Sequence, residues 1–326
     1  LKMLPFDNKS EFQVVVDMPA GTPVEETAAV MRELGGYLAT VPEVTNYQAY
    51  AGTAAPINFN GLVRQYYLRS GGEVGDIQVN LVDKAHRSEQ SHAIATRVRP
   101  ALQEIGKRHN ANVKIVEVPP GPPVLAPIVA EIYGPNAQGR QDVAKAVRGV
   151  FGKTTGVVDV DDSLIASAPK KLLLVDRQKA ARLGVSQQAI VSTLATGLGG
   201  EATAYLHDET KYPAAATLRL PAEEQGSLET LLQLSVRSAS GKLVPISELV
   251  RISDTVREQP HYHKDLLPVS YVVADMAGAI DSPLYGMFGM RGDIAGIATP
   301  GGGNVAEHFI SQPDDPYRSF ALKWDG

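Results

Sequence analysis

The sequence predicts an α+β protein with two similar β-α-β-β-α-β units, the second of them opened by an inserted α/β subdomain. Three observations lead to this prediction. Strand-like and helix-like apolar patterns follow each other in the same order twice, a proline-rich run separates the two copies, and a stretch with its own helices and hairpin interrupts the second copy. This order is the split βαβ or ferredoxin-like arrangement, and its recurrence indicates an internal duplication.

The first copy is predicted to begin with a strand over 11–18, because three consecutive valines form its centre. Thr22 is in the position of an N-cap for the helix that follows. Pro23 suits the first helical position, and two glutamates then fall in the first turn, where they favour the helix dipole. We expect this helix to end near Leu38.

The second strand is predicted over 44–50, and its alternation places Val44, Asn46, Gln48 and Tyr50 on one face. The remaining elements of this copy are, in order, a glycine-rich loop over 51–61, extended segments over 62–68 and 76–82, a helix capped by Ser88 that ends near Lys107, and a strand over 112–118. The first subdomain is therefore predicted to occupy 1–120.

The run 119–123 contains four prolines and one glycine and is predicted to be a rigid linker. The second copy is predicted as strand 128–133, helix 137–151 and strand 157–162, followed later by strand 268–275, helix 282–297 and strand 305–311. The interrupting part is predicted to hold helices over 178–184 and 186–196, a hairpin around 207–211, and strands at 218–220 and 234–236. The limits that follow are 121–176 with 255–326 for the second subdomain and 177–254 for the insertion.

Composition excludes several classes of protein. The chain has 326 residues, 44% of them hydrophobic, which is enough for two or three compact domains. Its net charge of −5 argues against general nucleic-acid binding. No cysteine is present, so disulfide scaffolds, thiolate zinc sites and cysteine nucleophiles are excluded. No stretch is apolar enough to span a membrane, and both ends look cut, so we expect a soluble piece of a longer protein.

Two groups of possible metal ligands stand out, but neither completes a site. His261 and His263 would share one side of a strand and can hold a metal together, yet no third ligand accompanies them, so surface histidines are favoured. Asp159, Asp161 and Asp162 gather at a strand end without the glycine and terminal glutamate of a calcium loop. We therefore predict no metal site.

Enzyme motifs are also missing. Residues 197–202 fit G-x-G-x-x-A, but they follow a helix, where glycine is an ordinary C-terminal stop. No nucleophile elbow, Walker loop or H-E-x-x-H occurs. Met287 and Met290 are better interpreted as core filler than as ligands for soft metals. The prediction is a protein that is not an enzyme and needs no cofactor.

Aromatic residues gather around the glycine-rich loop over 51–61. Tyr47, Tyr50, Phe59, Tyr66 and Tyr67 lie on its flanks. They can line a cleft for apolar ligands or pack in the core of the first subdomain, and the sequence leaves both interpretations open.

Several segments together resemble a known family. They are MLPFDNKSEF at 3–12, DMPAGTP at 17–23, VPEV at 41–44, DRQKAARLGVS at 176–186, LGG at 198–200 and GKLVPISEL at 241–249. The chain resembles the second large periplasmic loop of the resistance-nodulation-division (RND) efflux permeases. In this family the loop consists of two porter subdomains, with a docking subdomain inserted into the second.

The resemblance implies the periplasmic portion of a bacterial inner-membrane, proton-driven exporter. Such a permease is a homotrimer that works with a periplasmic adaptor and an outer-membrane channel. Membrane helices would flank this loop in the parent protein, and the isolated loop would be mostly monomeric and would transport nothing. A stand-alone periplasmic binding or adaptor module is the alternative.

The resemblance also implies where substrate and partners bind. The two porter subdomains open and close a cleft, and its expected wall consists of Met18, Gln48, Tyr50, Phe59 and Tyr66. The tip of the inserted hairpin, with His207, Asp208, Glu209 and Lys211, is expected to contact a neighbouring protomer or the channel.

The substrate class follows from the methionines of the expected cleft. Members that export copper or silver use several methionines there, whereas here Phe59 and Val124 stand near two of those places and Met18 alone is a thioether. We therefore expect drugs or other amphiphilic small molecules as substrates, with a heavy-metal exporter as the alternative.

Overall fold

The computed structural model describes residues 6–118, 124–278 and 282–325. The chain divides into two compact units, a larger one of residues 1–167 with 258–326 and a smaller one of residues 168–257. The proline-rich run predicted as a linker lies outside the described residues. The three subdomain limits expected from the sequence stay a prediction.

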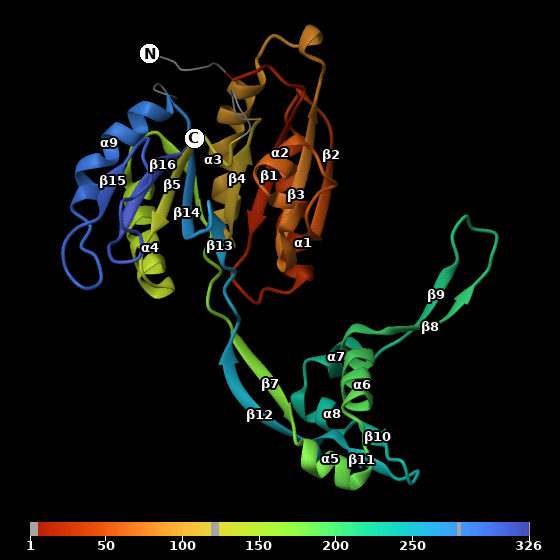
Figure 1. Ribbon diagram of the computed structural model, residues 1–326. Helices are drawn as coiled ribbons and strands as arrows, with labels where there is room; N and C mark the ends of the chain where they lie inside the picture. The colour runs from red at the N-terminus through yellow and green to blue at the C-terminus, as the bar shows by residue number, and fades with distance from the viewer. Residues whose placement is uncertain (1–5, 119–123, 279–281, 326) are drawn as a thin grey trace. The chain divides into compact units, whose positions relative to one another are not determined.

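The first half of the larger unit, residues 6–118, is an antiparallel four-stranded sheet with two long helices (Figure 1). Its elements are β1 (Glu11–Asp17), α1 (Val24–Leu38), β2 (Val44–Thr53), α2 (Phe59–Val63), η1 (Tyr66–Leu68), β3 (Ser70–Leu81), η2 (Lys84–His86), α3 (Ser91–Arg108) and β4 (Asn112–Val116). The strands lie in the order β2-β3-β1-β4, which places the second strand at one edge and the fourth at the other.

Helices α1 and α3 pack against one face of this sheet. Val14 and Val16 of β1 point to that face and pack in the same core as Leu34 of α1. None of these three side chains is exposed to solvent. Each such side chain contributes about 1.5–3 kcal/mol by leaving water. Gly75 of β3 allows α1 to approach closely, because a Cβ there would lie 2.3 Å from the sulfur of Met31.

The second half, residues 124–167 and 258–325, repeats the arrangement. Its elements are β5 (Ile128–Tyr133), α4 (Ala137–Lys153), β6 (Val157–Asp162), β13 (Tyr262–Lys264), β14 (Leu267–Met276), α9 (Pro283–Ala295), β15 (Ala306–His308) and β16 (Ala321–Asp325). The main strands lie in the order β6-β14-β5-β16, again second, third, first, fourth. The α+β class is confirmed, and the order of elements agrees with the predicted pair of β-α-β-β-α-β units.

One strand of the second half was assigned wrongly from the sequence. The closing strand was expected over 305–311, but that region supplies only the three-residue β15, which pairs in parallel with β16. The fourth strand is β16, which pairs with β5. Its five residues are too few for a clear alternating pattern, and the buried indole of Trp324 stabilises them through tertiary packing.

The smaller unit has a core of its own. Its elements are β7 (Pro169–Val175), α5 (Arg177–Leu183), α6 (Gln187–Gly199), β8 (Glu201–Leu206), β9 (Ala214–Leu218), α7 (Ala222–Gln225), α8 (Leu228–Gln233), β10 (Ser235–Arg237), β11 (Leu243–Pro245), η3 (Ile246–Glu248) and β12 (Val250–Val256). Ile190 and Ile246 are fully buried in it. The predicted cap at Ser186 is confirmed, since its hydroxyl accepts a hydrogen bond from the Ala189 amide at 3.1 Å. Gly200, at φ +81°, ends α6 as expected.

Several local predictions for the first half are wrong. The Thr22 hydroxyl donates to the carbonyl oxygen of Pro19 at 2.7 Å and does not cap α1, which begins at Val24. Ser88 does not cap α3 either, because that helix begins three residues later. Residues 62–63 and 66–68 belong to two short helices joined by a turn, where an extended segment was expected. At Thr22 a competing local hydrogen bond replaces the expected cap. For α3 and residues 62–68, contacts with distant residues override the local preference.

An irregularity also changes the predicted face of β2. The pairing of β2 with β3 shifts register between Val44 and Asn46. Val44 therefore packs against the helix-facing core, as Tyr47 does. It does not share a face with Gln48 and Tyr50, contrary to the simple alternation expected from the sequence.

Trp324→Ala should strongly destabilise the larger unit. The indole is 3% exposed, stacks on Phe151 with 5.9 Å between ring centroids, and donates to Glu307 at 2.6 Å. Truncation should cost about 3–5 kcal/mol. Urea unfolding followed by circular dichroism measures this loss, since the variant has no tryptophan fluorescence. Tyr317→Ala, at a 67% exposed position, is the control, and equal midpoints for the two variants would contradict the prediction.

Candidate functional site

The face of the first sheet opposite α1 and α3 is polar, and residues 54–69, the covering segment, lie on it. This segment joins β2 to β3 and contains α2 and η1. The Asn58 side chain accepts from the Gly61 amide at 2.7 Å, which starts α2, and donates to Gln78 of β3 at 2.9 Å. The Ala55 amide donates to the Asp76 carboxylate at 2.9 Å. Hydrogen bonds to the sheet therefore position the start of the segment.

Arg69 positions the end of the covering segment on the same sheet. Its guanidinium forms ion pairs with Asp17, at 2.5 Å, and with Asp76, and also donates to the carbonyl oxygen of Val16 at 2.8 Å. Burial raises the pKa of the Asp76 carboxyl, although the charge of Arg69 opposes the rise. The segment is therefore attached to β1 and β3 at the point where it re-enters the sheet.

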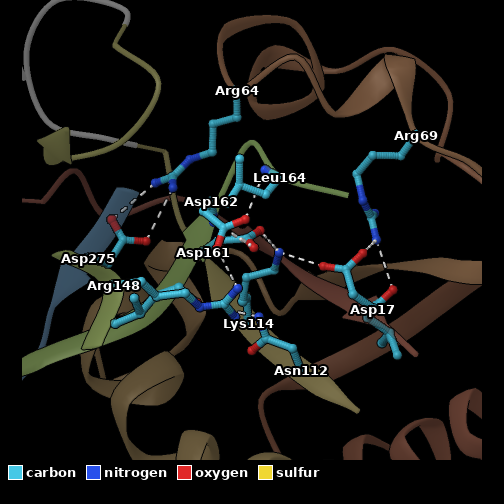
Figure 2. A network of polar contacts seen from close by, with 12 residues as sticks. Asp17, Arg64, Arg69, Asn112, Lys114, Arg148, Asp161, Asp162, Leu164 and Asp275 are labelled. Carbon is cyan, nitrogen blue, oxygen red and sulfur yellow. Dashed lines mark hydrogen bonds and ion pairs between the residues drawn. The ribbon is translucent and has the colours of Figure 1, made fainter. Parts of the chain in front are cut away.

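Lys114 connects the first half with the second. Its ammonium lies between Asp17 at the end of β1, at 2.6 Å, and Asp161 of β6, as Figure 2 shows. Burial alone would lower the pKa of Lys114, but Asp161 and Asp17 raise it well above its usual value. Burial likewise would raise the pKa of Asp17, yet Lys114 and Arg69 hold it well below its usual range. Lys114 and Asp17 are therefore both charged at neutral pH.

Two further buried ion pairs cross between the halves. Arg64 of the covering segment reaches both carboxylate oxygens of Asp275 on β14, each at 3.3 Å (Figure 2). Arg99 of α3 pairs with Asp159 of β6 and donates to the Ile115 carbonyl oxygen at 3.1 Å. We call these contacts, together with those of Lys114, the joint. Three ion pairs cross the joint, one from each of these cations. In each pair the first half supplies the cation and the second half supplies the carboxylate.

Asp159 is the unusual member of the joint. Its φ is +53°, and the pairing of β6 with β14 shifts register nearby, between Val273 and Asp275. Its Oδ2 contacts Arg99, but its Oδ1 is buried without a hydrogen-bond partner among the described residues. Burial raises the pKa of Asp159 to about 6 despite Arg99, and the charge of Asp275 adds to the rise. This carboxylate is therefore incompletely stabilised by its surroundings.

The structure places four of the five residues predicted to line the cleft on the same side of the first sheet. Gln48 and Tyr50 lie on the polar side of β2, where the Tyr50 hydroxyl donates to Gln48 at 3.0 Å. Phe59 begins α2 and is 47% exposed. Tyr66 is partly buried beside Lys114 and Arg69, whose charged groups lie 5.9 and 5.7 Å from its ring centroid. These four residues belong to the covering segment or to the sheet face beneath it.

Met18 lies apart from them. It follows β1 and packs against the helix-facing core of the first half, on the other side of the sheet. Tyr47, one of the clustered aromatics, packs there too. Each of the two interpretations of the aromatic cluster therefore applies to different residues. Tyr47 packs against the core, whereas Phe59 and Tyr67 are exposed.

The four residues predicted at the hairpin tip lie between β8 and β9 and are all exposed. Asp208 accepts from the Thr210 hydroxyl and from the Thr210 amide, the latter at 2.9 Å, and these hydrogen bonds lower the pKa of Asp208. Lys211 lies over the ring of Tyr212, with 5.3 Å from its ammonium to the ring centroid. His207 and Glu209 complete the charged tip.

The possible metal ligands found in the sequence have other surroundings. His263 lies on β13 and His261 just before it, and both are exposed. The aspartates of β6 bind cations of the protein itself, with Asp162 held by Arg148 at 2.6 Å. Within residues 6–118, 124–278 and 282–325, no three His, Asp or Glu side chains come together as a metal ion would require.

Sequence reasoning missed the cations of the joint, although two of them left a signal. Lys114 is the single charged residue in the apolar run of β4, and Arg99 lies on the buried side of α3. A charged side chain within a buried run needs a counter-charge. Asp275 leaves the same signal as the single charged residue of β14, but its partner Arg64 is 211 positions away and could not be identified from the pattern.

Solved structures share this architecture. A heavy metal efflux pump, in a first crystal form, aligns with 100% of the chain at a TM-score of 0.71 and 15% sequence identity, and the match covers 31% of the pump's own chain. Its second crystal form aligns with 89% of the chain at a TM-score of 0.67 and 16% identity, over 30% of that chain. The fold is therefore that of a segment of an efflux transporter.

The family model of AcrB/AcrD/AcrF matches residues 1–282, and the chain belongs to this family of RND efflux transporters. The nickel and cobalt resistance protein CnrA of Cupriavidus metallidurans is 27% identical over 40% of the chain and 13% of CnrA. The multidrug export protein AcrF of Escherichia coli is 24% identical over 75% of the chain and 23% of AcrF. The chain thus spans less than a third of each relative. None of its described helices has the length and apolar character needed to cross a membrane.

The raised pKa of Asp159 should make stability depend on pH. The carboxyl titrates near 3.8 when unperturbed and near 6 in the fold, so the folded state holds an extra proton between these values. Its contribution to the free energy of unfolding is therefore favourable below about pH 4 and is lost as pH rises through 6, by about 3 kcal/mol. Urea unfolding of the wild type and of Asp159→Asn from pH 4 to 8 measures this difference.

Asp162→Asn is the control, because it removes a carboxylate from the same strand whose partner, Arg148, lies within the second half. Between pH 4 and 8 the free energy of unfolding should fall more in the wild type than in Asp159→Asn, because only the wild type has the Asp159 carboxyl. An equal change with pH in both variants, relative to the wild type, would contradict the assignment to Asp159.

Proposed function

We propose that this chain is the periplasmic portion of a bacterial inner-membrane RND permease that captures substrate between its two halves and docks to partner proteins. Membership of the family supports this proposal. In the parent protein the permease forms a homotrimer and works with a periplasmic adaptor and an outer-membrane channel. The exposed, charged tip of the β8–β9 hairpin, with His207, Asp208, Glu209 and Lys211, contacts one of these partners.

The exposed apolar side chains of the covering segment carry the proposal for the substrate. They are Ile57, Phe59, Leu62, Tyr67 and Leu68, and they are 44–71% exposed. Five such side chains within twelve residues form an apolar surface beside the polar joint, as a site for amphiphilic molecules would. Phe59, Tyr66, Tyr50 and Gln48 form its wall. Drugs and other amphiphilic small molecules are therefore the proposed substrates.

A heavy-metal exporter is the second candidate, and the relatives favour it. CnrA is a nickel and cobalt resistance protein, and CzcA of Cupriavidus metallidurans, which is 24% identical over 40% of the chain, is a cobalt-zinc-cadmium resistance protein. The surroundings of the residues at the joint argue against it, because Asp17, Asp159 and Asp275 already bind cations of the protein. Free carboxylates would suit a metal better.

Phe59→Ala in the full-length transporter should weaken export of amphiphilic drugs. Burying a phenylalanine against a ligand contributes about 1.5–3 kcal/mol, so affinity should fall roughly tenfold or more. Drug susceptibility of an efflux-deficient strain that expresses the variant measures this effect. Tyr317→Ala, exposed and far along the chain, is the control. Unchanged export of every substrate tested would rule out Phe59 as part of the substrate path.

Titration of the chain with silver(I) or copper(I) tests the soft-metal form of the heavy-metal candidate. The variant is made at Met18, the one thioether that the sequence predicted for the cleft, although in the structure it packs against the helix-facing core. The drug assignment predicts no tight stoichiometric binding, because a single thioether is a poor site for a soft metal. Calorimetry on the wild type and on Met18→Leu provides the measurement. Tight binding that disappears in Met18→Leu would reverse the choice between the two substrate classes.

A further inference from the structure

The covering segment is attached to both halves of the larger unit. By chain connectivity it belongs to the first half, where Arg69 holds it to Asp17 and Asp76. Five residues earlier in the chain, the Arg64 side chain binds Asp275 on β14 of the second half. Tyr66 lies between these two attachments. One short segment therefore has one fixed point in each half.

The attachment at Arg64 is buried and specific. Its side chain is 5% exposed and that of Asp275 is 8% exposed. Two guanidinium nitrogens meet two carboxylate oxygens, the bidentate geometry that gives arginine its orientational precision. One of these nitrogens also donates to the carbonyl oxygen of Glu117 at 3.2 Å, just beyond β4. The pair thus holds the segment at the joint.

Little else holds the middle of the covering segment. Its helix α2 has five residues and η1 has three, which is too short to be stable alone. Ile57, Leu62 and Leu68 are 58–71% exposed, so they bury little apolar surface. Segments with few buried contacts open at low cost. Beyond the hydrogen bonds at its start and the buried Asn60 and Gly61, the position of the segment therefore depends on its ion pairs.

We propose that Arg64 and Asp275 are positioning residues that couple the covering segment to the second half, so that the segment moves when the two halves separate. This inference rests on the proposed function, in which the segment carries the apolar surface that meets the substrate. When the joint opens, Arg64 must either release Asp275 or move with it. Either event changes the position of Phe59 and Tyr66 relative to one of the two halves. Opening of the joint thereby alters the substrate site.

A nitroxide spin label at Leu62→Cys tests the coupling. The chain has no native cysteine, and Leu62 is 58% exposed on α2, so the label attaches at one place with little disturbance. Because an exposed label follows the motion of its backbone, the attached segment should give a slow component in the wild-type continuous-wave spectrum, which we call the immobilised component. Asp275→Asn should cause loss of that immobilised component. Asp162→Asn, whose partner Arg148 lies in the same half, should leave it unchanged.

A second measurement separates loss of the coupling from general loosening. Labels at Arg32→Cys on α1 and Lys145→Cys on α4 report the distance between the halves, because both positions are exposed. In Asp275→Asn this distance should stay as in the wild type, since the pairs of Lys114 and Arg99 remain. The distance from Leu62→Cys to Lys145→Cys should broaden. Restoration of the immobilised label by Arg64→Asp with Asp275→Arg would support a direct pair.

Two results would overturn the proposal: an immobilised Leu62 label in Asp275→Asn, or equal broadening of both distances. If Asp275→Asn loses its circular dichroism spectrum, Arg64→Lys decides, because it keeps the charge but loses the two-point contact and should release the label partially. None of these readouts requires transport. A label released by Asp275→Asn while export by the full-length transporter is unaffected by Phe59→Ala would leave the coupling in place and reject the proposed substrate site.

Discussion

The ammonium of Lys114 is the point on which the larger unit depends. A buried charge of this kind is tolerated only with counter-charges close by, and here they come from two different places, the end of β1 and the strand β6. Asp17 in turn forms an ion pair with Arg69, which attaches the end of the covering segment to the sheet. One buried cation therefore contacts a carboxylate of each sheet and, through Asp17, is linked to the covering segment.

The polar character of the joint distinguishes it from the cores on either side. Within each half, helices bury apolar side chains against the sheet, and separating those surfaces would expose hydrocarbon to water. At the joint, cations of the first half meet carboxylates of the second, and both sets can be hydrated on separation. Replacing buried ion pairs by apolar residues often stabilises a protein. A polar joint is thus suited to an interface that opens and closes.

The sequence predicted the repeated order of strands and helices because that order depends on local patterns. The valines of β1 and the capping serine of α6 are examples, since burial or hydrogen bonding within a few residues decides them. The helical turns over 62–68 and the strand that contains Trp324 could not be predicted, because distant partners stabilise both. The candidate site divides in the same way: clustered aromatics drew attention to Phe59 and Tyr66, whereas Arg64 and Asp275 become neighbours only in the folded chain.

The two halves also share the place at which each accepts extra chain. In the first, the covering segment lies between the second and third strands, and in the second, residues 168–257 lie between β6 and β14, again the second and third strands. The ends of the longer insertion are joined by its own ladder, from Val175 opposite Val250 to Pro169 opposite Val256. The insertion therefore leaves and re-enters the second half through two paired strands, so for the sheet it replaces a short connection between β6 and β14. Growth at this connection leaves the pairing of the sheet unchanged, so a whole inserted unit can be gained or exchanged without redesigning the fold that carries it.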